Sequence, residues 1–68
     1  MATGTVKWFN KTKGFGFIVP DEGEKNIFVH MTAVLESGLQ ELNEGQKVRY
    51  QPIEETKGLK ATEISAIE

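Results

Sequence analysis

The residues of this chain best suited to chemistry are two phenylalanines, Phe15 and Phe17, in the run Lys-Gly-Phe-Gly-Phe-Ile at 13–18. Because side chains two apart on a β-strand point to the same face, the two rings share one face and Ile18 lies on the other. The glycine between the rings leaves the backbone bare, so that a flat partner can approach both rings closely. Flat rings beside Lys13 suit a phosphate chain that carries flat bases. The segment therefore predicts a stacking platform for single-stranded nucleic acid.

Catalytic and metal-binding chemistries lack the residues that they need. The chain has no cysteine, and its single histidine, His30, has no motif of further metal ligands around it. No nucleophile with a positioned base is visible either. We therefore expect no enzyme activity, no metal or other cofactor, and no small-molecule substrate.

The charges are unevenly distributed along the 68 residues, whose formal net charge is −2. Residues 1–20 contain three lysines and no acidic residue, whereas residues 21–68 contain five basic and ten acidic residues. A local positive field can attract phosphate even when the whole molecule is slightly acidic. With so few cations, we expect few phosphate contacts and a shallow dependence of binding on salt.

Alternating side chains and turn residues predict strands at about 4–10, 15–19, 26–30, 46–53 and 59–67. A single helical turn is expected from Thr32 to Ser37, with Thr32 as its N-cap and Gly38 as its terminator. Pro52, near the end of the fourth strand, indicates an edge or a bulge. Because five strands with so little helix must hide their edges, we predict one all-β domain over residues 1–68, built as a small barrel.

The same alternation assigns the core of this barrel. The side chains expected to face inward are Val6, Ile18, Ile27, Val29, Val48, Tyr50, Ile53 and Ile64. Phe28 and His30 then lie on the opposite face from Ile27 and Val29. Since the aliphatic set can fill a small barrel without the phenylalanines, these rings are left on the surface, where an aromatic cluster usually marks a binding site.

Trp8 has two possible placements. Strict alternation puts it in the core with Val6, whereas a bulge in a bent first strand turns it outward. The residues alone leave both placements open.

With these residues placed, the chain resembles a bacterial cold-shock domain over essentially its whole length. The resemblance is carried by spaced motifs in the family's order: Gly-Thr-Val-Lys-Trp-Phe-Asn at 4–10, Lys-Gly-Phe-Gly-Phe-Ile at 13–18, Ile-Phe-Val-His at 27–30 and Leu-Asn-Glu-Gly-Gln at 42–46. RNA-recognition motifs share the second of these runs. They also carry two amphipathic helices on a four-stranded sheet, and this sequence has nothing to supply those helices.

The resemblance implies a five-stranded antiparallel oligonucleotide-binding barrel that binds single-stranded RNA and DNA. It implies exposed stacking roles for Trp8, Phe15, Phe17, Phe28 and His30, and so favours the outward placement of the tryptophan. Further contacts with the nucleic acid are expected from Lys7, Asn10, Lys13, Met31, Lys57 and Lys60. The role that follows is an ATP-independent RNA chaperone that melts weak secondary structure, in cold shock or in general regulation of transcription and translation.

The sequence departs from the family pattern at a few positions. Met31 stands where the residue after Val-His is usually aromatic, and Leu39 stands where a loop aromatic is frequent. Because a stacked base is worth about 1–3 kcal/mol, we expect weaker binding than in an all-aromatic relative. Lys60 adds some attraction for phosphate.

A second hypothesis is a small protein-interaction barrel, since an aromatic groove can also dock a proline-rich peptide. The net acidity of the chain favours this hypothesis, and the lysine beside the glycine–phenylalanine pattern disfavours it. The N-terminus lacks the apolar run of a signal peptide, and no stretch approaches the ~20 apolar residues that span a membrane. We therefore expect a soluble cytoplasmic monomer with no membrane partner.

Overall fold

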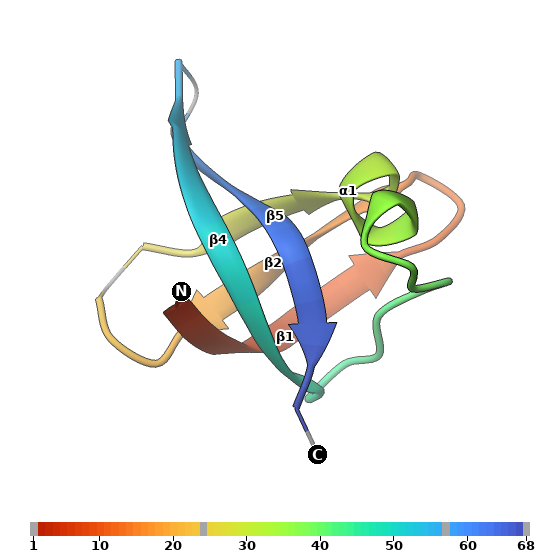
Figure 1. Ribbon diagram of the computed structural model, residues 1–68, viewed down its shortest axis with the longest axis horizontal. Helices are drawn as coiled ribbons and strands as arrows, with labels where there is room; N and C mark the ends of the chain where they lie inside the picture. The colour runs from red at the N-terminus through yellow and green to blue at the C-terminus, as the bar shows by residue number, and fades with distance from the viewer. Residues whose placement is uncertain (1, 24, 57, 68) are drawn as a thin grey trace.

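The computed structural model describes residues 2–23, 25–56 and 58–67, and this part of the chain forms a closed five-stranded barrel with one short helix (Figure 1). The strands are β1 (Ala2–Asn10), β2 (Phe15–Pro20), β3 (Ile27–His30), β4 (Lys47–Glu55) and β5 (Gly58–Ala66), and the helix α1 (Met31–Glu36) follows β3. The predicted all-β barrel is confirmed, and each strand end lies within two residues of its expected position.

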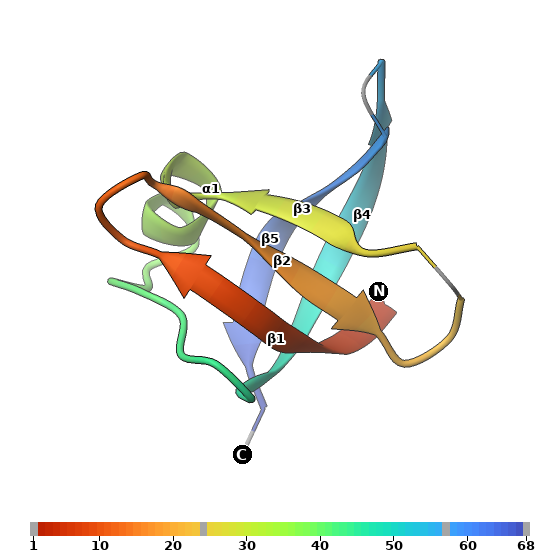
Figure 2. The same ribbon diagram turned by 180° about the vertical axis from the view of Figure 1, so that it is seen from behind.

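The strands follow the order β1-β2-β3-β5-β4 around the barrel, and β1, β2 and β3 lie side by side in Figure 2. Four of the pairings are antiparallel, as expected: β1–β2, β1–β4, β2–β3 and β4–β5. The pairing that closes the barrel, between β3 and β5, is parallel and places Phe28 opposite Lys60. Because strand directions cannot alternate all the way round a ring with an odd number of members, one parallel pair is unavoidable.

The barrel interior is aliphatic apart from one tyrosine. The predicted core residues that are at most 3% exposed are Val6, Ile18, Ile27, Val29, Val48, Tyr50 and Ile64. The prediction for Ile53 is wrong, since this side chain is 43% exposed. The extra residue of the β4–β5 bulge lies on β5, where Glu63 has a positive φ of 49°, so the alternation of β4 is unbroken and turns Ile53 outward.

The helix and the loop after it complete the core with residues that strand patterns do not identify. Ala33 and Val34 of α1 and Leu42 of the loop are buried in the same cluster. The helix begins one residue earlier than expected, and the prediction of Thr32 as its N-cap is wrong. His30 caps it instead, because its ring nitrogen Nδ1 accepts a hydrogen bond from the backbone N–H of Thr32 at 3.1 Å.

Burial raises the pKa of the Tyr50 hydroxyl above its ordinary value of 10.0, and the negative charge of Asp21 adds to the shift. Below pH 10 this group leaves the free energy of unfolding unchanged, because both states keep the proton. Above pH 10 the unfolded chain releases the proton more readily, so the free energy of unfolding should fall with rising pH. We expect Tyr50→Phe to lose part of this alkaline fall.

Urea unfolding followed by tryptophan fluorescence, at about pH 8 and about pH 10.5, measures this effect. Because the wild type and the variant differ only at position 50, the difference between their alkaline falls isolates the tyrosine. An alkaline fall of the same size in both proteins would show that Tyr50 ionises equally in the folded and unfolded chain.

Candidate nucleic-acid interface

A bulge in β1 turns Trp8 outward. The register between β1 and β2 passes from Val6 opposite Ile18 directly to Trp8 opposite Phe17, so that Lys7 is the extra residue. Directly opposite residues on paired strands share a face. Trp8 therefore shares the outer face with Phe17, and the outward placement is confirmed over the alternative in the core.

Five aromatic side chains of β1, β2 and β3 form one continuous surface, here called the aromatic face: Trp8, Phe15, Phe17, Phe28 and His30. The Trp8 ring meets the rings of Phe15 and Phe17 edge-on, with centroids 5.5 and 5.4 Å away. Phe28 stacks on Phe15 at 5.7 Å and meets Phe17 edge-on at 5.8 Å. Edge-to-face contacts of this kind hold each ring against its neighbours. The rings thus support one another as a single surface.

Strand register explains why these rings meet. Phe15 lies opposite His30 and Phe17 opposite Phe28 across the β2–β3 pair. Each ring is half-buried except that of His30, which is exposed. Because the other faces of β2 and β3 supply the core, the rings are held from beneath by the barrel and remain open to solvent on the outside.

Gly16 is expected from the sequence to leave the backbone bare for a flat ligand, but the structure gives it a different role. It lies on the inner face, buried and opposite Phe9, and not beside the surface that a ligand would approach. A Cβ at this position would collide with the backbone oxygen of Trp8 and come within 2.7 Å of the Cα of Phe9. The glycine therefore lets β1 approach β2 closely at the bulge.

The turn between β1 and β2 carries Lys13, two residues before Phe15 of the aromatic face. The side-chain oxygen of Asn10 accepts a hydrogen bond from the backbone N–H of Lys13 at 2.8 Å, and the Asn10 carbonyl accepts one from Gly14 at 2.7 Å. The Gly14 carbonyl in turn accepts from the N–H of Met31 at 2.8 Å. Asn10, predicted as a contact for nucleic acid, thus has a structural task in this turn.

The remaining predicted site residues are dispersed around this surface. Met31 is half-buried and packs against the core, as does Leu39. Lys7 and Lys13 are exposed. Lys60, half-buried, joins the far edge of the aromatic face because β5 pairs with β3. Lys57 lies outside the described residues.

Some of the lysines form ion pairs with carboxylates. Lys11 lies 3.9 Å from Glu41, and Lys47 lies 3.1 Å from Asp21. Hydrogen bonds from the Thr3 hydroxyl and then from Lys47 lower the pKa of the Asp21 carboxyl below its ordinary value of 3.8. Within the described ranges, Lys7 and Lys13 have no such partner, so their charges remain available for phosphate.

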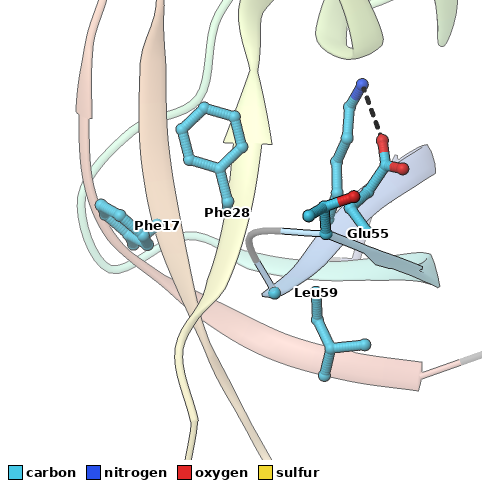
Figure 3. A pocket seen from close by; sticks show the side chains of 7 residues that line it. Phe17, Phe28, Glu55 and Leu59 are labelled. Carbon is cyan, nitrogen blue, oxygen red and sulfur yellow. Dashed lines mark ion pairs between the residues drawn. The ribbon is translucent and has the colours of Figure 1, made fainter.

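A groove of about 570 Å³ separates the aromatic face from the β4–β5 hairpin (Figure 3). Its lining residues are Phe17, Phe28, Glu55, Thr56, Gly58, Leu59 and Lys60. Sequence reasoning missed Glu55 and Leu59 as site residues. The one signal that points to them is the hairpin turn at 55–58, and it reveals nothing about which strand the hairpin adjoins.

Two kinds of site are not found in the part of the chain that the structure describes. No group of three or more His, Cys, Asp or Glu side chains there could hold a metal ion. No helix in those residues is long and apolar enough to cross a membrane.

Comparison with known proteins adds to this geometry. The family model of the 'Cold-shock' DNA-binding domain matches residues 2–67. The chain is 60% identical over 57 residues to the probable cold shock protein y4cH of Sinorhizobium fredii, a match that covers 84% of this chain and 83% of that one. It is 55% identical over 62 residues to the cold shock protein CspA of Rhizobium meliloti, a match that covers 91% of this chain and 90% of that one.

A third relative, the cold shock-like protein CspE of Escherichia coli, is 45% identical over 64 residues, covering 94% of this chain and 93% of its own. The matches thus extend through all three strands of the aromatic face and through the hairpin that flanks it. The chain belongs to the cold-shock DNA-binding domain family, whose members bind nucleic acid and are not enzymes.

Proposed function

We propose that this protein binds single-stranded RNA and DNA with little overall sequence preference and acts as an ATP-independent RNA chaperone. The observation that carries the proposal is the continuous aromatic face, in which rings from three adjacent strands contact one another within 6.3 Å. Every base has a flat π-face, so stacking on such a surface tolerates any sequence and contributes about 1–3 kcal/mol per base. Lys7 and Lys13, which are exposed and lie in the chain next to Trp8 and two residues before Phe15, supply charge for the phosphates.

Binding of the single strand alone shifts the equilibrium of a hairpin by mass action. At a protein concentration 100 times the dissociation constant, this shift is about 2.7 kcal/mol per site. One step of stacked base pairs is worth about 1.4 kcal/mol. Each bound molecule therefore offsets roughly two steps, which opens weak hairpins and leaves strong ones closed. One barrel carries the whole aromatic face, so we infer that a monomer suffices.

Trp8, the only tryptophan, reports on this interaction directly. We expect its fluorescence to be quenched by a short oligothymidine, because a base stacks on the indole, and to be unaffected by the corresponding duplex, whose bases are already stacked. Equal responses to both would contradict a single-strand chaperone. Displacement of the oligothymidine by a proline-rich peptide, with tighter binding of the peptide, would favour the peptide-binding hypothesis instead.

A further inference from the structure

The groove beside the aromatic face has polar groups that stacking does not use. Its walls are mostly apolar, and its volume of about 570 Å³ lies within the range of ligand sites. Such sites combine apolar walls with a few polar groups that orient the ligand and give specificity. Figure 3 shows the rings of Phe17 and Phe28 on one side of the groove, and Glu55 with its ion-pair partner on the other.

The polar groups are a carboxylate and an ammonium held side by side. Glu55 Oε1 lies 4.0 Å from Lys60 Nζ, and the two side chains are 53% and 37% exposed. This separation exceeds hydrogen-bond length, so each group keeps its capacity to bond to a third partner. Lys60 is directly opposite Phe28 in the β3–β5 pair. A base that stacks on Phe28 at the groove therefore brings its edge to an acceptor and a donor together.

We propose that this groove is a base site in which Glu55 and Lys60 select guanine, an inference that rests on the proposed function. Guanine presents two adjacent N–H donors, N1 and N2, to a carboxylate, and its O6 beside them accepts from an ammonium. Thymine and uracil present one N–H between two carbonyl oxygens, so a carboxylate that accepts from N3 faces an adjacent oxygen of like charge. The groove thus gives one guanine-selective position on a surface that otherwise tolerates any base.

A comparison of oligonucleotides tests this assignment. Oligothymidine and a series with a single guanine at each successive position are titrated against the wild type and against Glu55→Gln, which keeps the size of the side chain and removes its charge. We expect one position at which guanine binds the wild type about tenfold more tightly than thymine. In Glu55→Gln we expect that ratio to fall to about twofold or less, because the amide replaces one of the two acceptor oxygens by an NH2 group that would face a guanine N–H donor to donor.

The absolute affinity of Glu55→Gln for oligothymidine should stay level or rise, since Lys60 loses its ion-pair partner and is free for phosphate. Glu44→Gln makes the same change in net charge in the exposed loop before β4 and should keep the guanine preference. A wild type that binds oligothymidine but shows no guanine preference, or a Glu55→Gln variant that retains it, overturns the base site and leaves the proposed function standing. Failure of the wild type to bind any single strand overturns both.

Discussion

Replacement of Phe17 by alanine should weaken binding of single-stranded nucleic acid by about 1–3 kcal/mol, or about 5- to 150-fold in dissociation constant, while the barrel stays folded. Phe17 is central to the aromatic face, because its ring meets Trp8 at 5.4 Å and Phe28 at 5.8 Å and also lines the groove. Its removal takes away one stacking surface, and the neighbouring rings of Trp8 and Phe28 each lose one contact. The outward side of β2 loses the ring, and the buried core on its inner side is untouched.

Anisotropy of a fluorescently labelled oligothymidine measures this loss without relying on Trp8, whose surroundings the substitution changes. Leu35→Ala is the matched control, because Leu35 is an apolar side chain that is 58% exposed on α1 and not part of the aromatic face. It should leave the dissociation constant unchanged. Urea unfolding of both variants separates a loss of binding from a loss of fold. Unaltered affinity in Phe17→Ala would mean that the bases bind elsewhere.

The inner and outer faces of β2 and β3 could be predicted from sequence because their alternation is unbroken. Ile18 and Val29 are fully buried while Phe17 and Phe28 stay on the surface, as a period of two requires. The bulge at Lys7 could not be predicted in this way. A bulge adds one residue to a strand without a signature in residue type, so two placements of the following tryptophan fit the pattern equally well.

The groove could not be predicted from the sequence, for a related reason. Glu55 and Leu59 lie beside Phe28 only because β5 closes the barrel against β3, a pairing between segments some thirty residues apart. Local patterns specify the face of a strand, and they do not specify its neighbour. The misplacement of Ile53 has a different origin. Unbroken alternation from Val48 and Tyr50 turns Ile53 outward, and an inward Ile53 would need a bulge in β4, whereas the irregularity lies at Glu63 of β5.

The second large effect is expected from Gly16→Ala, which should lower the free energy of unfolding by at least about 1–3 kcal/mol, the usual result of overpacking. The added methyl group would collide with the backbone oxygen of Trp8 and would lie 2.7 Å from the Cα of Phe9. Backbone atoms cannot move aside as the end of a flexible side chain can, so β1 must shift away from β2. For a domain whose total stability is ~5 kcal/mol, this is a large share.

Urea unfolding measures the change, with Val19→Ala as the control on the same strand. Val19 is 42% exposed, so its truncation should change the free energy of unfolding by about 0.5 kcal/mol or less. Because the strand that must shift carries the bulge, Gly16→Ala should also disturb the contacts of Trp8 with Phe15 and Phe17. Single-strand affinity should then fall even at temperatures where the variant is folded. A variant as stable as the wild type would show that the close approach of β1 to β2 is not what positions the tryptophan.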